Sequence, residues 1–311
     1  IVGYNSAICT NGSISNLNFG IITNDGPWVQ TGGSDIWFNN GYPYTIPAGA
    51  TCQSYASLLN PAGTGTPGVI YTGIGSDNFG SGQASQDPYN WKVGGISSYS
   101  ESYGPANSGS PLATSYSYIR NLAITNGTPP TLLTSAHCGA GGITNCSLSP
   151  TLASGIYEAS GNLTLSSNYA FPANRDYVIL VSENLRLNGT IDVPPTSTVL
   201  FSVQGNIYVD STVGTSTITS LTPHLEGWFS TDHSFYIEGN NTCPTADNRL
   251  NMEGALVVNA SLQGGNFYNL RDLCSGNSNC PVFYIKERPD FSLNAPRFIK
   301  NAPRVYREVA P

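Results

Sequence analysis

The chain has 311 residues, of which only 10% are charged, and its formal net charge is −7. This acidic balance leaves no basic surface to neutralise phosphates, which argues against a nucleic-acid partner. No apolar run approaches the ~20 residues of a membrane-spanning helix, so we expect no membrane span. The helix-favouring residues Glu, Lys and Met are scarce, which favours an all-β protein.

Residues 1–25 are rich in Gly, Asn and Ser, and we interpret them as an entry segment or cap. The chain begins at Ile1 without a methionine, so we expect either a mature product whose leader was removed or a fragment. Residues 32–38 (GGSDIWF) resemble residues 205–209 (GNIYV), and residues 69–71 (VIY) are bounded by Pro and Gly. Both segments predict strands, in a solenoid that starts near residue 26.

Residues 80–150 differ from the rest because Gly, Ser, Tyr and Pro dominate them. A helical spacing follows Ser110-Pro111, with the apolar residues Leu112, Tyr116, Ile119, Leu122 and Ala123. This pattern predicts one short helix inside a loop-rich insertion. Insertions of this kind are where binding or assembly surfaces are found.

A short repeat organises the chain from residue 158 to about residue 262. Three units of the form Asn-apolar-x-apolar begin at Asn162, Asn184 and Asn206, with a spacing of 22 residues each time. Upstream, residues 178–181 align with residues 200–203. The alternation of apolar residues predicts strands with one buried face, and stacked coils would bury that face. We therefore expect a single-stranded parallel β-helix, a solenoid with coils of about 22 residues.

The repeating asparagines predict a ladder of stacked amides along one corner of the coils. The alternative is that Asn only marks turns in an Asn-rich chain. After Asn206 the interval lengthens, and we expect further strands at residues 234–237 and 255–262, with the extra residues inserted at turns.

The C-terminal segment changes character after a final predicted strand at residues 281–285. Residues 286–311 hold six basic and three acidic residues, whereas the remainder holds six basic and sixteen acidic residues. Prolines at 289, 296, 303 and 311 predict an extended, basic tail without a regular helix or central strand. We expect the tail to dock on its own solenoid or on a neighbouring subunit, with these anchors: Arg297, Phe298, Ile299, Arg304, Val305 and Tyr306. The predicted organisation is thus 1–25, 26–285 and 286–311.

Seven cysteines indicate an oxidising compartment. Cys138 and Cys146 lie close in sequence, as do Cys274 and Cys280, and each pair encloses a loop rich in Gly, Ser and Asn. We predict these two disulfides. The odd count leaves at least one thiol free or paired with another chain.

Two fragments imitate a chymotrypsin-like serine protease: Ile1-Val2-Gly3, and residues 133–138 (LTSAHC) around His137. The chain lacks a Gly-Asp-Ser-Gly sequence for the nucleophile, so we do not predict a protease. The three histidines, His137, His224 and His233, lack metal-ligand spacing, and we predict no metal or cofactor. Asp210, Asp232 and Asp247 could offer oxygen ligands to calcium, but no acidic loop repeats.

Polysaccharide cleavage is the enzymatic alternative, because a β-helix can present a long groove to a linear sugar. Hydrolysis would need two opposed carboxylates, for which Glu183, Asp192 and Asp210 are candidates near turns. The exposed row on the predicted coil face carries no carboxylate: Thr164, Arg186, Tyr208 and Tyr236. This absence favours a protein that is not an enzyme.

Several segments together carry a resemblance: residues 26–33 (GPWVQTGG), 203–207 (VQGNI), 250–255 (LNMEGA), 286–291 (KERPDF) and 308–311 (EVAP). With these motifs the chain resembles a group of uncharacterised secreted, β-helix-like proteins of candidate-phyla (Patescibacteria-type) bacteria. The resemblance spans most of the chain and is weakest over residues 80–150. It implies a bacterial surface or extracellular setting and no particular chemistry.

We therefore expect a non-enzymatic, extracellular structural protein. It would be a subunit of a surface filament or layer, assembling through the ends of the solenoid, the C-terminal tail, or both. The expected partner is a further copy of the chain. The alternative is a carbohydrate-binding or carbohydrate-cleaving β-helix protein, or an adhesin, with a glycan as partner.

Overall fold

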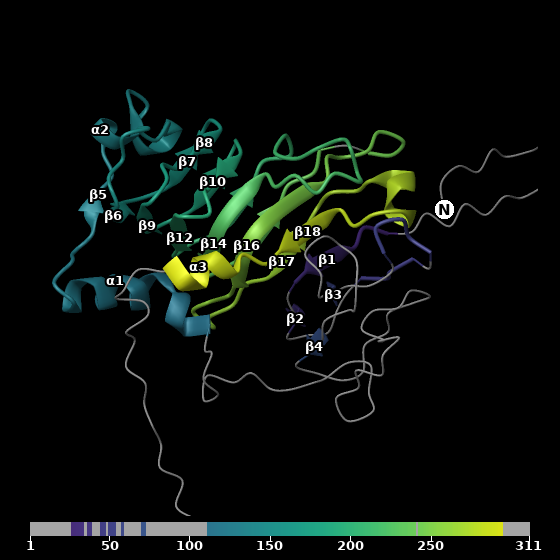
Figure 1. The fold of residues 1–311 in the computed structure, drawn as a ribbon, viewed down its shortest axis with the longest axis horizontal. Helices are drawn as coiled ribbons and strands as arrows, with labels where there is room; N and C mark the ends of the chain where they lie inside the picture. The colour runs from purple at the N-terminus through teal and green to yellow at the C-terminus, as the bar shows by residue number, and fades with distance from the viewer. Residues whose placement is uncertain are drawn as a thin grey trace, which may run out of the picture.

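The computed structural model describes residues 26–33, 36–38, 44–47, 49–53, 57–58, 70–72, 111–240 and 242–294. These residues form mostly parallel β-structure with few helices (Figure 1). The helices are α1 (Tyr116–Thr125), α2 (Ser135–Cys138) and α3 (Pro289–Asn294), with 3₁₀ turns at Pro111–Thr114, Gly142–Asn145 and Cys274–Ser278. The strands are β1 (Val29–Gly32), β2 (Ile36–Phe38), β3 (Ser57–Leu58), β4 (Ile70–Thr72), β5 (Thr131–Leu132), β6 (Gly155–Ala159), β7 (Leu163–Leu165), β8 (Tyr169–Ala170), β9 (Asp176–Val181), β10 (Leu185–Leu187), β11 (Ile191–Asp192), β12 (Thr198–Val203), β13 (Ile207–Val209), β14 (Leu225–Thr231), β15 (Phe235–Ile237), β16 (Leu250–Val258), β17 (Phe267–Asn269) and β18 (Phe283–Lys286).

Two parallel sheets form the body of the protein. The main sheet has 11 strands, with the order β3-β1-β18-β16-β14-β12-β9-β6-β5 and with β8 and β11 joined at its side. A second sheet has five strands in the order β17-β15-β13-β10-β7. From β6 onward the chain alternates between the two, so that consecutive strands of each sheet are one repeat apart in sequence.

The predicted repeat is confirmed residue by residue. Leu185 of β10 pairs with Leu163 on one side and Ile207 on the other. In the main sheet, Leu200 pairs with Val178, and the four-residue alignment predicted from the sequence is the observed register. Equal spacing in sequence therefore corresponds to equal position along each strand.

The core lies between the two sheets. Alternate residues of β7, β10, β13 and β15 are buried against inward side chains of the main sheet. Aromatic rings stack from one strand to the next, as with Phe201 and Phe229, whose ring centroids are 5.0 Å apart. Stacking like residues at the same height lets neighbouring coils share one continuous core.

Strands of the main sheet are also buried on their outer face. Tyr116 and Ile119 of α1 pack on Val178, Leu180 and Leu200, which point away from the second sheet. This double burial explains why β9 is a continuous apolar run, as in other parallel sheets covered on both sides. The helix predicted after Ser110-Pro111 is thus confirmed, and it covers the sheet.

The order of the first strands differs from the prediction. Instead of starting the stack near residue 26, β1 pairs in parallel with β18, the last strand of the chain. The small β2–β4 sheet does not join either large sheet. Local resemblance predicted strands here but could not predict their neighbours, because a strand edge accepts any extended segment with matching side chains.

One predicted disulfide is present and the other is wrong. Cys138 and Cys146 are bonded, with an intervening separation of 8 in sequence. Cys274 is bonded to Cys243, and Cys280 is bonded to Cys52, 228 residues away. Proximity in sequence did not predict the partners of Cys274 and Cys280. Packing of the strands brings Cys243 next to Cys274 and Cys52 next to Cys280, although these partners are distant in sequence.

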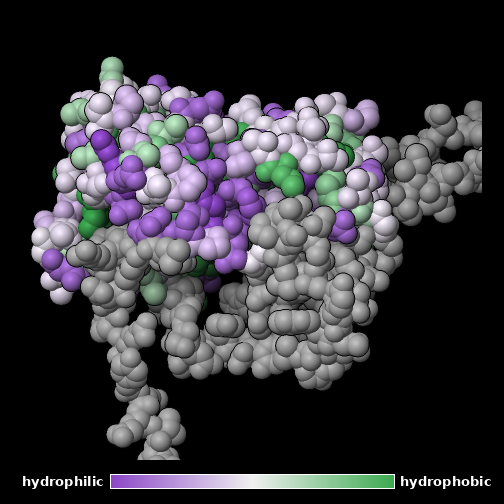
Figure 2. All heavy atoms as spheres, viewed as in Figure 1, coloured by the Kyte–Doolittle hydropathy of each residue, from purple (hydrophilic) through white to green (hydrophobic). Residues whose placement is uncertain are grey.

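The start of the tail is a helix, not an extended segment. Pro289 is the first residue of α3, a position where its missing N–H costs no hydrogen bond. Phe291 is buried against Trp228, and the Arg288 guanidinium donates to both carboxylate oxygens of Asp290 (2.8 and 2.7 Å) and to Glu226 (3.2 Å). Figure 2 shows hydrophilic residues gathered around α3. Residues 286–294 therefore dock on their own chain.

The six predicted tail anchors lie outside the described residues: Arg297, Phe298, Ile299, Arg304, Val305 and Tyr306. Residues 1–25 also lie outside them, as do all residues of the predicted insertion before residue 111. The predicted roles of these segments remain predictions.

The stacked core predicts a large cost for removing one of its rings. We expect Phe201→Ala to lower the free energy of unfolding by about 3–5 kcal/mol, because the fully buried ring leaves a cavity beside Phe229. Urea denaturation followed by circular dichroism measures the change. Leu132→Ala, at a side chain that is 56% exposed, is the matched control and should change it by less than about 0.5 kcal/mol. Equal effects of the two substitutions would contradict this location of the core.

Candidate functional site

The predicted asparagine ladder is present at the corner before three strands of the five-stranded sheet, β7, β10 and β13. The Asn162 side-chain oxygen accepts hydrogen bonds from the backbone N–H of Asn184 (3.1 Å) and from its amide group (2.9 Å). The Asn184 oxygen accepts the same two bonds from Asn206 (2.8 and 3.3 Å). Each amide therefore binds a backbone donor of the next coil, which the turn would otherwise leave without a partner.

The ladder continues through two residues that the sequence analysis did not assign to it. The Asn206 oxygen accepts the N–H of Ser234 (3.0 Å), and the Ser234 hydroxyl accepts the N–H of Asn266 (3.0 Å). These steps span 28 and 32 residues, so the fixed spacing of 22 could not identify them. Their position directly before β15 and β17 was the available signal. A side chain at Gly205 would lie 2.7 Å from the Asn184 oxygen, so glycine keeps the coils close here.

A row of side chains follows the exposed face of the same sheet. Thr164, Arg186, Tyr208, Tyr236 and Tyr268 occupy equivalent positions on the five strands. The tyrosine rings stack on each other, with centroids 4.9 and 4.7 Å apart and interplanar angles of 11° and 14°. Because the rings use their faces to stack, they present edges and hydroxyls to solvent. Sugars bind to the faces of aromatic rings, and the ring of Tyr236 is stacked on both of its faces.

Charged side chains on this face pair with one another. The Arg186 guanidinium donates to Asp210 (2.9 Å) and to both oxygens of Glu238 (2.9 and 2.6 Å). Burial by itself would raise the pKa of Asp210, but hydrogen bonds from Thr212 and the charge of Arg186 hold it below its usual value. A glycosidase acid needs the opposite shift. Sequence analysis missed Glu238, although it lies four residues after the ladder position, as Asp210 does.

The three carboxylates considered for hydrolysis have different surroundings. Glu183 is exposed and accepts a hydrogen bond from the Asn162 amide (2.5 Å). Asp192 is exposed on β11, and Asp210 pairs with Arg186. They do not form an opposed pair in the described structure.

The three histidines contribute to local structure in three separate places. The His137 ring accepts the backbone N–H of Thr134 (3.2 Å) and so caps α2. Burial lowers the pKa of His224, whose Nδ1 accepts the N–H of Asn251 (3.2 Å). His233 contacts a backbone carbonyl before β17 (3.1 Å). Among the described residues the His137 side chain contacts Thr134 and the Tyr157 ring, neither of which is a serine or an aspartate.

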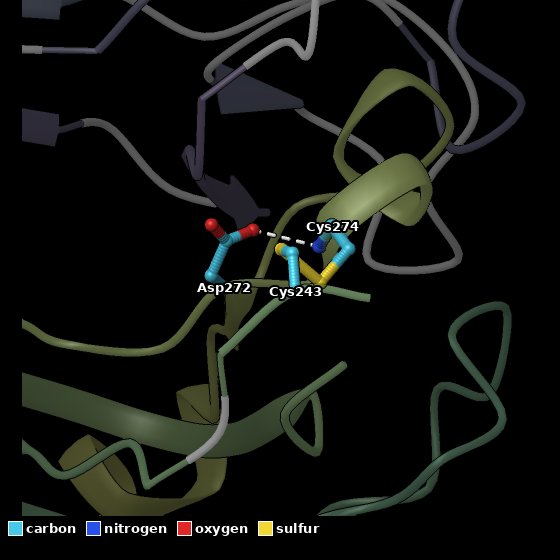
Figure 3. A group of neighbouring side chains, drawn as sticks. All are labelled: Cys243, Asp272 and Cys274. Carbon is cyan, nitrogen blue, oxygen red and sulfur yellow. Dashed lines mark hydrogen bonds between the residues drawn. A yellow bond between two sulfur atoms is a disulfide. The ribbon is translucent and has the colours of Figure 1, made fainter. Parts of the chain in front are cut away.

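One group of side chains has the residue types of a metal site. Cys243, Asp272 and Cys274 lie together, with their potential ligand atoms within 4.8 Å of one another (Figure 3). The two sulfurs are bonded to each other, so neither is a thiolate ligand. Asp272 accepts hydrogen bonds from the N–H of Cys274 (2.6 Å) and the amide of Asn277 (2.7 Å). The arrangement fits a disulfide-closed turn better than a metal centre.

The candidate calcium ligands are likewise dispersed. Asp210 pairs with Arg186, and Asp247 accepts backbone N–H groups of Asn240 (3.1 Å) and Asp272 (3.0 Å). Asp232 accepts the N–H of Tyr116 (3.3 Å) at the start of α1. Three carboxylates at three locations do not make a shared site.

Buried acids hold α1 on the main sheet. Glu158 accepts hydrogen bonds from the Tyr116 hydroxyl and from Arg120 Nε, the latter at 2.9 Å. Among the described residues Asp232 forms no ion pair with Arg or Lys, and burial raises its pKa to about 6. Deprotonation of Asp232 is therefore less favourable in the folded protein than in the unfolded chain.

The ladder predicts a position-dependent loss of stability. We expect Asn184→Ala to lower the free energy of unfolding by about 1–3 kcal/mol, since the N–H of Asn206 loses its acceptor. Asn266→Ala is the control, because in the described residues the Asn266 side chain holds no backbone amide of a further strand. Chemical denaturation compares the two variants. A loss as large in the control would argue that the amides act only as turn residues.

The raised pKa of Asp232 predicts that its replacement by asparagine increases stability, and that the increase depends on pH. Its raised pKa means that the folded state is penalised as pH rises from about 4, the unfolded value, through about 6. Asp232→Asn keeps the acceptor for Tyr116 and removes the charge, so it should stabilise the fold by about 1–3 kcal/mol at pH 8 and very little at pH 4. Thermal unfolding across this range checks the prediction. The exposed Glu287→Gln is the control and should show no such trend.

No helix among the described residues is long and apolar enough to cross a membrane. No family model, curated protein or solved structure matches this chain. Its function is therefore inferred from its own residues.

Proposed function

We propose that this chain is a non-enzymatic, extracellular structural protein, a parallel β-helix that assembles end to end into a surface filament or layer. The observation that carries the proposal is the exposed face of the five-stranded sheet. On this face the tyrosine rings stack on one another and the charged side chains form salt bridges with one another. Arg186 forms salt bridges with Asp210 and Glu238, and the rings of Tyr208 and Tyr236 stack. We infer that such a face is rigid and chemically unreactive.

The β-helix assignment is supported by the path of the chain. Between β6 and β9 the chain passes through the main sheet, the five-stranded sheet and the short β8–β11 pair before it returns to the main sheet. The next strands repeat this order with parallel pairing. A ladder of side chains at one corner and stacked aromatic residues in the core fit such a coil.

Three disulfides support an extracellular setting, because they persist in oxidising compartments. The few lysines and arginines leave a surface of low charge. Low charge allows copies of the chain to approach closely.

Assembly is supported by the ends of the sheets. Among the described residues, no strand pairs with the outer side of β17. Tyr268 and Leu270 beside this edge are 37% and 56% exposed. An unpaired strand edge with exposed apolar side chains is a template for pairing with another chain, and a head-to-tail contact that does not close produces a fibre.

Assembly predicts a concentration-dependent increase in particle size for the oxidised protein. Leu270→Lys should strongly reduce it, because a charge at the edge opposes pairing. Thr164→Lys, at the opposite end of the row where β7 is covered by the Cys146 bridge, should leave assembly unchanged. Light scattering and negative-stain microscopy measure the result, with circular dichroism to verify folding.

Two results would contradict this function. The first is a wild-type protein that stays monomeric at every concentration. The second is release of sugar from a polysaccharide that is lost in Glu238→Gln, which would instead favour the carbohydrate-cleaving alternative. Truncation after Asn294 tests the remaining tail and leaves the docked helix α3 in place.

A further inference from the structure

The strand order of the main sheet is circularly shifted relative to the sequence. From β6 to β18 the strands follow one another in chain order, yet β1 and β3 lie beyond β18 at the far edge. All these pairings are parallel, and β1 matches β18 over four residue pairs from Val29↔Phe283 to Gly32↔Lys286. The first strand thus completes the edge left by the last.

This contact is extensive and specific. Trp28 is fully buried, and its indole N–H donates to the Asn277 carbonyl (2.8 Å). The backbone of Trp28 accepts the N–H of Val282 (2.9 Å), and Cys52 donates its N–H to Asn279 (2.9 Å). The edge of β18 therefore requires this segment, and an uncovered edge would expose apolar core.

A covalent bond closes the same contact. Cys52 follows β1, Cys280 precedes β18, and the two are joined across 228 positions of sequence. Oxidation of the two thiols releases two protons and two electrons. With glutathione disulfide as oxidant, the products are the protein disulfide and two molecules of glutathione. The disulfide therefore holds the β1 segment covalently on the β18 edge that it covers.

The length of chain between β4 and α1 allows β1 and β3 to pair with β18 of another copy. Residues 73–110 separate β4 from the 3₁₀ turn that precedes α1, and 38 residues can span up to about 130 Å. Since α1 packs on β9 and β12, four strand spacings or about 19 Å separate β18 from β9. A linker of this length reaches the β18 edge of the same copy or of an adjacent copy.

We propose that β1 and β3 of one copy pair with β18 of a neighbouring copy, in the register seen here, and that the Cys52–Cys280 disulfide forms between the two chains. This inference rests on the proposed assembly and adds a contact at β18 to the one proposed at the β17 edge. The strands of each chain then follow one another in sequence order along a continuous sheet. The partner surface differs from the donor segment, so the contact is head-to-tail and propagates.

Isotope mixing tests the exchange with the wild-type chain. Equal amounts of ¹⁵N-labelled and unlabelled protein are reduced, unfolded and refolded together with glutathione disulfide. Free thiols are then alkylated at low pH, and the Cys52–Cys280 peptide pair is examined by mass spectrometry. Exchange between copies predicts mixed labelled–unlabelled pairs as abundant as the two unmixed forms together.

Cys138–Cys146 supplies an internal control, because its two cysteines lie in one short loop. The decisive quantity is the excess of mixed Cys52–Cys280 pairs over mixed Cys138–Cys146 pairs. An excess supports exchange. No excess overturns it and shows that each chain covers its own edge.

Particle size in the same samples separates this inference from the proposed function. Filaments without mixed Cys52–Cys280 pairs would overturn strand exchange and leave the structural function standing on other contacts. Monomers without mixed pairs would overturn both. Filaments with mixed pairs, shortened by reduction of the disulfide, are the expected result.

Discussion

Parallel strands of two to nine residues can be stable only if their backbone N–H and C=O groups find partners on both sides. In this protein the neighbouring strands of each parallel sheet supply them, with one register maintained from β7 to β17. At the corners, where the chain leaves a strand, the side chains of Asn184 and its equivalents accept the remaining N–H groups. The last edge, at β18, is covered by β1 and locked by Cys52–Cys280.

A second consequence concerns the outer face of the main sheet. Parallel strands buried on both faces need a covering layer, which α1 and α3 provide. These helices bring charged groups to the sheet, where each requires a partner. Glu158 has Tyr116 and Arg120, and Arg288 has Asp290 and Glu226. These ionisable groups therefore help to attach the covering helices to the sheet.

The exposed face of the five-stranded sheet has a different balance. Its side chains form contacts along the stack: tyrosine on tyrosine, and Arg186 with Asp210 and Glu238. These contacts connect neighbouring strands of the sheet, and the Tyr236 ring is stacked on both of its faces. They support the proposed structural role, in which the strand edges are the surfaces of interest.

The sequence by itself determined the strands of the repeat, their register and the Asn162–Asn184–Asn206 ladder. It could do so because a constant spacing of 22 places equivalent residues at the same height in successive coils. It also predicted the helix before residue 125 and the Cys138–Cys146 bridge, which depend on local spacing. Insertions of variable length concealed Asn266 and Glu238, whereas Ser234 began a predicted strand and was missed because it is not an asparagine.

Only the tertiary structure decided that β1 lies beside β18, that Cys280 bonds to Cys52 and Cys274 to Cys243, and that the tail begins as a docked helix. These contacts join segments whose separation in sequence carries no information about their separation in space. They depend on which edge and which face remain uncovered after the repeats have stacked, and that becomes defined only when the whole chain is folded.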